Sequence, residues 1–314
     1  METQVYFESD KTKVITHIQK IAPFLWFDDE SEYAVNFYIS IFRNSKVNFR
    51  SYYNEEGSKA SGQPKGSLMT INFQLEGYEF TAINGGPAFK VSPVISFFVN
   101  CDSVEEIDFL WNRLTDSGKI MMEIDKYPFS ERYGWVQDKF GISWQLILDR
   151  REQKITPCLM FSGDQHLKAE EAINFYTSIF KNSSIIQMEH YTKDMGGPIG
   201  AVVHCRFNLE NTQFVAMDSH SNLPYNFNPA ISMVIYCKTQ QELDYYWDKL
   251  TQGGDESAQQ CGWLQDKYGM SWQIVPESID QMISSNDERK TNNFMKAMMQ
   301  MKKLDILTLE KALE

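Results

Sequence analysis

Hydrophobic positions follow first a short continuous pattern and then a helical one along this chain, and the same order of patterns occurs twice. In the first half the apolar runs predict a strand, a helix, a hairpin, a strand, a second helix and a closing strand: 21–27, 34–42, 67–75 with 78–83, 94–99, 104–114 and 143–148. The second half predicts the same elements in the same order: 155–161, 172–180, 201–209 with 213–217, 231–236, 243–250 and 271–275. Each half therefore reads as two successive βαβββ units.

The first strands and two of the connections each allow a more specific prediction. Pro23 and Pro157 lie inside the first strand of each half, and proline removes a ladder donor, so we expect an edge strand or a bulge there. The connections 119–133 and 255–261 differ in length between the halves, which is typical of surface loops.

The repeat is also visible in the residues themselves. The run Gly134-Trp-Val-Gln-Asp-Lys-Phe-Gly-Ile-Ser-Trp-Gln145 returns, with conservative changes, at 262–273, and the helix run at 34–42 returns at 172–180. A period of about 130 residues is too long for a solenoid unit and has the size of a domain. We therefore expect a tandem duplication with four parts: an N-terminal arm (1–17), a first domain (18–150), a second domain (151–276) and a C-terminal helical tail (277–314).

Composition excludes several classes of protein. The formal net charge of −12 disfavours a nucleic acid or an anionic membrane as the main partner. No apolar run approaches the roughly 20 residues that span a bilayer, and residues 1–13 lack the apolar stretch of a secretory signal. The five cysteines are odd in number and form no CxxC pair, which favours buried free thiols in a reducing, cytoplasmic compartment.

The tail has no counterpart in the first half. A helix is expected to begin near Asp287 and to carry Phe294, Met298, Met301 and Leu304 on one face. Methionine-rich faces adapt to varied partners, but packing against the second domain explains the same pattern.

The helix run, the Phe-Gln-Leu and Phe-Asn-Leu hairpin strands (73–75, 207–209) and the closing-strand run together resemble the PhnB-like family. That family, labelled 3-demethylubiquinone-9 3-methyltransferase, belongs to the vicinal-oxygen-chelate superfamily of glyoxalase I, extradiol dioxygenases and bleomycin-resistance proteins. The resemblance implies an α+β fold of tandem paired βαβββ modules, with mainly antiparallel cupped sheets and C-terminal helices. It also implies that the fused halves form an internal pseudo-dimer; a further homodimer remains open.

In the superfamily's metal enzymes, His or Glu on the first strands of modules and Glu on the last hold one divalent ion. The matching positions here are Pro23 and Pro157 on the first strands, Val94 or Ser96 and Ala230 or Ser232 on the module-two strands, and Gln145 and Gln273 on the closing strands. Neither proline nor neutral glutamine supplies the charged ligand that a hard or borderline cation prefers. The resemblance therefore implies a cup without the usual metal site, and no cofactor is predicted.

Candidate ligand-binding residues remain in the expected cups. Gln145 and Gln273 offer a donor and an acceptor each, and His204 lies on a strand that should line a cup. Four tryptophans are candidates for flat apolar walls, or else for core positions: Trp135, Trp144, Trp263 and Trp272. The pairs Asp138-Lys139 and Asp266-Lys267 are expected to be turns with solvated charges.

Three functions stay open on this basis. The first is a small-molecule-binding protein that uses no metal. The second is a metal-dependent lyase, isomerase or dioxygenase with unusual ligands, such as His204 with Glu79, Glu123 or Glu189. The third is an interaction protein that acts through the tail. Neither a dinucleotide-binding GxGxxG loop in a strand–helix context nor a GxSxG nucleophile elbow is present, and Cys261 has no assigned base.

Overall fold

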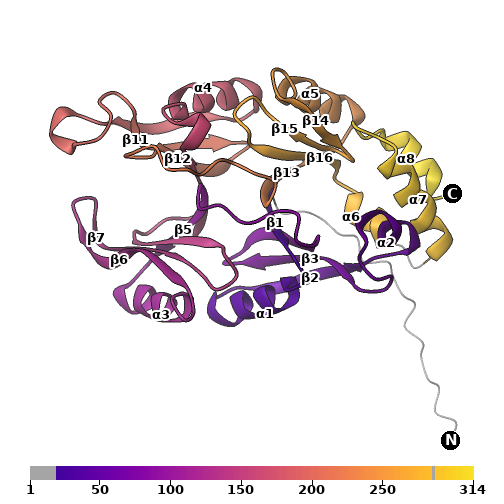
Figure 1. Ribbon diagram of the computed structural model, residues 1–314, viewed down its shortest axis with the longest axis horizontal. Coiled ribbons are helices and arrows are strands. Elements are labelled where there is room, and N and C mark those ends of the chain that lie inside the picture. Colours follow the sequence, from indigo (N-terminus) through magenta and orange to yellow (C-terminus); the bar gives the residue numbers. More distant parts are fainter. Residues whose placement is uncertain (1–18, 285–286) are drawn as a thin grey trace, which may run out of the picture.

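The computed structural model describes residues 19–284 and 287–314 and contains two eight-stranded sheets (Figure 1). Sheet A has the strand order β14 (Asp255–Gln260), β15 (Trp263–Gln265), β16 (Ser271–Pro276), β13 (Ile231–Cys237), β1 (Ile21–Phe27), β4 (Tyr78–Asn84), β3 (Leu68–Leu75), β2 (Lys46–Tyr52). Sheet B has the order β10 (Ser184–His190), β11 (Val202–Leu209), β12 (Thr212–Asp218), β9 (Ile155–Phe161), β5 (Ile95–Cys101), β8 (Ser143–Leu148), β7 (Ser130–Gln137), β6 (Lys119–Tyr127). The expected N-terminal arm, 1–17, lies outside the described residues.

Each sheet is built jointly by both halves of the chain. β1 pairs antiparallel with β13, with Ile21 opposite Ile235, and β5 pairs antiparallel with β9, with Ile95 opposite Leu159. Each half therefore gives four strands to sheet A and four to sheet B, which makes the tandem repeat an internal pseudo-dimer.

The predicted α+β class and the order of the apolar elements are confirmed, but the edge strands were not predicted. The range 119–133, expected to be a loop, forms β6 and the first half of β7, and β14 occupies most of 255–261. These strands are largely exposed on both faces, so they show no apolar alternation.

The prediction that the two prolines mark edge strands or bulges is wrong. β1 lies between β13 and β4, and its pairing with both neighbours is regular. Pro23 is tolerated because the parallel ladder to β4 begins only at Phe24, one residue later. In the second half, the ladder from β9 to β12 likewise begins at Cys158, after Pro157.

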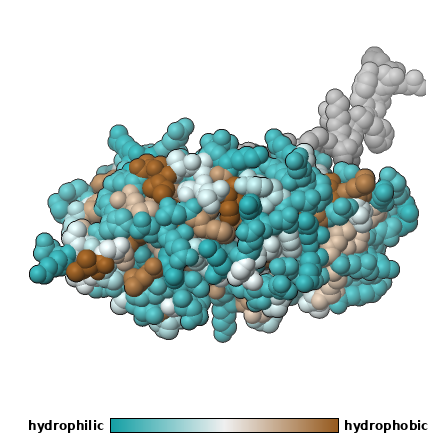
Figure 2. Space-filling view, turned by 90° about the horizontal axis from the view of Figure 1, so that it is seen from above, coloured by the Kyte–Doolittle hydropathy of each residue, from teal (hydrophilic) through white to brown (hydrophobic). Residues whose placement is uncertain are grey.

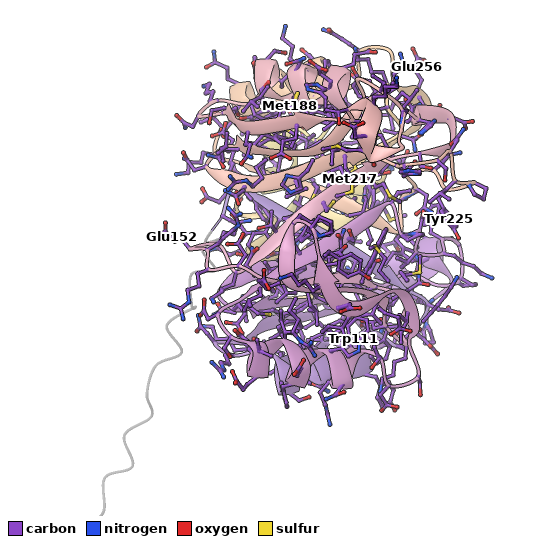
Figure 3. The ribbon with its side chains drawn as sticks, turned by 90° about the vertical axis from the view of Figure 1, so that its left-hand side faces the viewer. Trp111, Glu152, Met188, Met217, Tyr225 and Glu256 are labelled. Carbon is purple, nitrogen blue, oxygen red and sulfur yellow. The ribbon has the colours of Figure 1, made fainter. Side chains whose placement is uncertain are left out.

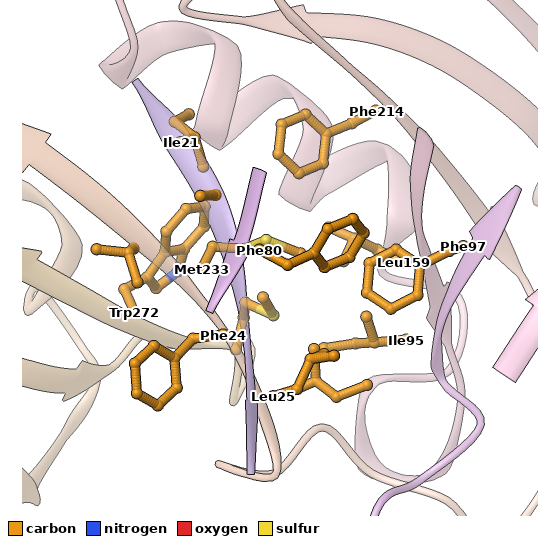
Figure 4. Close-up of a cluster of buried hydrophobic side chains, with 14 of the residues drawn as sticks. Ile21, Phe24, Leu25, Phe80, Ile95, Phe97, Leu159, Phe214, Met233 and Trp272 are labelled. Carbon is orange, nitrogen blue, oxygen red and sulfur yellow. The ribbon is translucent and has the colours of Figure 1, made fainter. Parts of the chain in front are cut away.

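Four amphipathic helices cover the sheets: α1 (Ser31–Ile41), α3 (Val104–Leu114), α4 (Ala169–Ile179) and α5 (Gln240–Leu250). In Figure 1, α1 and α3 of the first half lie along the lower side of the molecule, and α4 and α5 of the second half lie along the upper side. A continuous core joins the sheets between them. In Figure 4, Phe80 of sheet A lies beside Phe97 of sheet B, with ring centroids 5.2 Å apart. Both rings belong to the first half, so their burial favours the packing of its two units, one in each sheet.

The expectation that Asp138 and Asp266 are solvated is wrong. Both side chains are buried, and Asp138 accepts hydrogen bonds from the Tyr38 hydroxyl (2.7 Å), the Trp144 indole (2.8 Å) and two backbone amides. Asp266 accepts the equivalent bonds, with Tyr176 and Trp272 as side-chain donors. The lysines alone face solvent.

The tail packs on the molecule itself. It comprises α6 (Ile279–Ile283), α7 (Glu288–Met299) and α8 (Ile306–Ala312), and α7 also contacts the short helix α2 (Glu55–Ser61) of the first half. Phe294 and Leu309 are fully buried. Helix α7 begins next to Asp287, as predicted, but ends at Met299, so Met301 and Leu304 lie in the following loop. The tail thus joins both halves across one end of sheet A (Figure 1).

The surface seen over the second half is mainly hydrophilic, with small separate apolar patches (Figure 2). Among the described residues, no helix combines the length and apolar character that crossing a bilayer requires.

Candidate ligand site

A cavity of about 170 Å³ lies between sheet A and the tail, and we call this face of sheet A cup A. Phe24 and Trp26 of β1 and Trp263 of β15 form an aromatic wall, with ring centroids 5.6 Å apart for Phe24 and Trp263. Met295 and Met298 of α7 close the opposite side. Aromatic and thioether side chains give an apolar, adaptable lining.

Polar side chains also line this cavity, among them Gln273 on β16 and the carboxylate of Asp280 on α6. The side chain of Gln273 is 6% exposed, and its Nε2 donates to the Ser232 hydroxyl at 3.0 Å. Within residues 19–284 and 287–314, no group donates a hydrogen bond to Gln273 Oε1. The hydroxyl-bearing side chains Thr70, Thr81 and Tyr236 also line the cavity.

Cup B, the equivalent face of sheet B, is filled by its own side chains. Phe98 and Tyr133 are buried there with Cys158 and Val215. Tyr133 donates to Gln145 Oε1 at 2.6 Å, and Gln145 Nε2 donates to the Ser96 hydroxyl at 2.8 Å. The space beside His204 measures about 30 Å³. The carbonyl oxygen and the amide nitrogen of Gln145 therefore both have hydrogen-bond partners within the protein.

The difference between the cups follows from two repeat positions. Phe98 of cup B corresponds to Val234 of cup A, and Tyr133 corresponds to Cys261. Val234 and Cys261 both line the cavity of cup A. Smaller side chains at these positions leave room that cup B lacks.

His204 lies in cup B at the edge of the small space, with its ring against Phe98 at 6.3 Å. Burial lowers the pKa of its imidazole, and the positive charges of Arg206 and Arg151 act in the same direction, although Glu189 opposes them. The neutral form is thus favoured. His204 is an aromatic wall residue in this arrangement.

The four predicted tryptophans divide into two pairs. Trp263 lines cup A, and Trp135 packs beside the cluster of cup B, where its indole donates to the Ser143 hydroxyl at 2.7 Å. Trp144 and Trp272 are fully buried in the core, where Asp138 and Asp266 accept their indole N–H groups. A ligand in either cup would not reach them.

The usual metal positions do not fit a divalent cation. The register that places the first-strand ligand at Pro23 and Pro157 is wrong by one residue, because Phe24 and Cys158 are the neighbours that face the cups. The Cys158 thiol lies near Ser96 and Gln145, and burial raises its pKa to about 12. Phenyl, hydroxyl, carboxamide and protonated thiol groups provide no anionic or imidazole ligand at these positions.

The alternative ligands are also not brought together. Glu79 is in sheet A, where Asn72 donates to it at 2.8 Å, whereas His204 is in sheet B. Glu123 lies on β6, at the opposite edge of sheet B from Glu189 on β10. In the described part of the chain, no group of three or more His, Cys, Asp or Glu side chains is placed to hold a metal ion.

Several residues that line cup A were not predicted from the sequence: Phe24, Trp26, Val234, Tyr236 and Met298. Phe24 and Trp26 alternate with Pro23 and Leu25, so the correct register of β1 would have identified them. The tail methionines had no such signal, because the placement of α7 over sheet A depends on tertiary packing.

Comparison with known proteins agrees with this architecture. The profile of the family described as 3-demethylubiquinone-9 3-methyltransferase matches residues 19–147 and 153–275. No curated protein matches the chain. Among solved structures, a putative 3-demethylubiquinone-9 3-methyltransferase, PhnB protein, from Bacillus cereus is 39% identical over 41% of this chain and 99% of its own, with a TM-score of 0.38.

Two further structures are similar. A protein from Staphylococcus aureus is 32% identical over 43% of this chain and 100% of its own, with a TM-score of 0.18. Glyoxalase I from Zea mays is 12% identical over 84% of this chain and 95% of its own, with a TM-score of 0.54, which shows a shared fold. The chain belongs to the 3-demethylubiquinone-9 3-methyltransferase (PhnB-like) family, of which it carries two tandem copies in one glyoxalase-like pseudo-dimer.

Proposed function

We propose that the protein binds a small molecule in cup A and that it does so without a metal ion held by the usual family positions. The observation that carries this proposal is the cavity of about 170 Å³, walled by Phe24, Trp26 and Trp263 and closed by the tail. Concave, mostly apolar sites with a few fixed polar groups are typical of small-molecule binding.

The chemistry of the lining favours binding over metal-assisted catalysis. The family positions in cup A carry Phe24, Ser232 and Gln273, and none of these side chains is charged at neutral pH. These three positions therefore supply no anionic ligand to a metal ion. The carboxylate that lines the cavity, Asp280, belongs to α6 of the tail. Cup B serves as a packed structural counterpart.

Tryptophan emission tests the proposal directly, because Trp26 and Trp263 line the cavity. Small aromatic and aliphatic compounds should change the emission of the full-length protein in a saturable way. Val234→Phe, which copies Phe98 of cup B, should abolish the change by filling the cavity. Ile199→Phe is the matched control, because Ile199 is 72% exposed.

Elemental analysis of protein purified without chelator separates this proposal from a metal-dependent enzyme. We expect substoichiometric metal and unchanged binding after chelator treatment. One tightly bound divalent ion per cup would contradict the proposal and support the enzyme.

A further inference from the structure

The two cups share the same glutamine and serine but differ in what bonds to the glutamine carbonyl. In cup B the Tyr133 phenol donates to Gln145 Oε1 at 2.6 Å, while Gln145 Nε2 donates to Ser96. Tyr133 is 4% exposed, so this phenol is an internal part of cup B.

Cup A has the bond from glutamine to serine but not the bond from a tyrosine to glutamine. Gln273 Nε2 donates to Ser232 at 3.0 Å, and no donor to Gln273 Oε1 lies among the residues that the structure describes. Cys261 stands at the repeat position of Tyr133, and it lines the cavity. Gln273 lines the cavity, so a ligand there that carries a donor can bond to its carbonyl oxygen.

The cavity of cup A is large enough for a phenol ring, which is the group that Tyr133 carries and Cys261 lacks. A dry cavity of about 150 Å³ accepts a benzene ring in a well-studied engineered protein, and the cavity of cup A measures about 170 Å³. Phe24 and Trp263 provide aromatic contacts for a ring placed between the sheet and the tail.

From this comparison we infer that cup A takes a single-ring compound with one hydroxyl or N–H donor, phenol being the simplest, and that the donor bonds to Gln273 Oε1. The ligand completes in cup A the arrangement that Tyr133 completes in cup B. Gln273 selects for the donor, and the small side chains of Cys261 and Val234 provide the room. This inference rests on the proposed binding function of cup A.

Phenol and toluene are matched probes, since they differ by a hydroxyl in place of a methyl group. Their affinities for the full-length protein would be measured by calorimetry or tryptophan emission. Gln273→Met keeps the length of the side chain and removes the acceptor. We expect this variant to lower the ratio of phenol to toluene affinity roughly tenfold, the effect of one hydrogen bond to a buried group.

Gln145→Met is the matched control, because it removes the same carboxamide from cup B. It should leave the phenol-to-toluene ratio unchanged. The thermal unfolding midpoint of each variant establishes that it is folded. Val234→Phe should abolish binding of both probes, and it provides a second test if Gln273→Met does not fold.

The outcomes distinguish this inference from the function on which it rests. If both probes bind and Gln273→Met leaves their ratio unchanged, the donor preference is refuted while small-molecule binding in cup A stands. If Gln145→Met lowers the ratio of phenol to toluene affinity, or if the probes still bind to Val234→Phe, the probes bind outside cup A. Either result also refutes the inference. If neither probe binds the wild-type protein, both the inference and the proposed apolar site fail.

Discussion

The hydroxyl of Tyr38, on the first helix, donates to the carboxyl of Asp138, one hundred residues later, at 2.7 Å. Tyr176 and Asp266 repeat this contact at 2.8 Å. Each pair joins the first helix of a half to the turn before its closing strand, and so links a unit that contributes to one sheet with a unit that contributes to the other. The tyrosine lies in one of the two runs that the halves share most closely and the aspartate lies in the other, so the contact brings these two runs together in the fold.

Removing the tyrosine hydroxyl should destabilise the fold. Tyr38→Phe leaves a buried carboxyl with one donor fewer, and we expect a loss of about 2 kcal/mol in the free energy of unfolding. Tyr176→Phe should cost a similar amount, whereas Tyr33→Phe, at a residue that is 76% exposed, should cost almost nothing. Urea unfolding followed by circular dichroism measures all three, and equal midpoints for Tyr38→Phe and Tyr33→Phe would contradict the structural role.

The same carboxyls predict a pH dependence of stability. Burial raises the pKa of Asp138 and of Asp266 to about 6, although their hydrogen bonds oppose the shift. Because the folded pKa lies above the unfolded value of about 4, the folded state binds more protons between these values. The stabilisation is complete below about pH 4 and is lost as the pH rises through 6.

Urea midpoints of the wild type and of Asp138→Asn between pH 4 and pH 7 test this prediction. Asparagine does not titrate, so the advantage of the wild type over the variant should shrink as the pH rises, by on the order of 2–3 kcal/mol. An advantage that grows with pH would show that the folded pKa of Asp138 lies below the unfolded value.

The cysteines should differ in reactivity. Cys101, Cys158, Cys205 and Cys237 are buried, as the scattered pattern predicted for free thiols, whereas Cys261 is partly exposed and lines cup A. Burial raises the pKa of the Cys261 thiol, so its alkylation should be slow at neutral pH and faster in alkali. Mass spectrometry after iodoacetamide treatment of the native protein should find Cys261 modified first, with phenol slowing the reaction. Earlier modification of a buried cysteine would contradict this placement.

The tail should be required for the closed cavity. Phe294 is fully buried, and its replacement by alanine should cost about 3–5 kcal/mol and loosen α7. Emission of Trp26 and Trp263 should then shift to longer wavelength as water reaches cup A. Leu307→Ala, at a residue that is 58% exposed, is the control and should leave the emission unchanged. A shift in the control but not in Phe294→Ala would contradict the role of the tail as a wall.

Cutting the linker should not separate the halves. Glu152 is exposed at the outer edge of the molecule (Figure 3), so a protease site can be placed within 149–154. The β1–β13 and β5–β9 ladders and the shared core should hold the two fragments together on gel filtration. Separate elution of folded fragments would show that each half is an independent domain.

The elements that were predicted correctly from the sequence are those with a buried face, because their apolar residues recur at a regular spacing. The core strands and the four long helices were predictable because their apolar residues recur at the spacing of a strand or helix. Edge strands such as β10 were not, because none of the seven residues of β10 is buried. The sharing of sheets between halves also depends on long-range pairing that no local pattern encodes.

The candidate site was predicted only in part. Gln273 and Trp263 lie in cup A, as the family resemblance suggested, whereas Trp144 and Trp272 lie in the core. The difference between the cups depends on Phe98 and Tyr133 in place of Val234 and Cys261, and such an exchange acquires meaning only when the two faces are compared in space. The buried role of Asp138 was missed because a charged turn residue usually faces solvent.

A crystal structure of the full-length protein soaked with phenol tests the central claim most directly. We predict density for one ring in cup A, its hydroxyl within hydrogen-bonding distance of Gln273 Oε1, and no ring in cup B. Density for a metal ion between Phe24, Ser232 and Gln273, or a ring bound in cup B while cup A stays empty, would contradict the account.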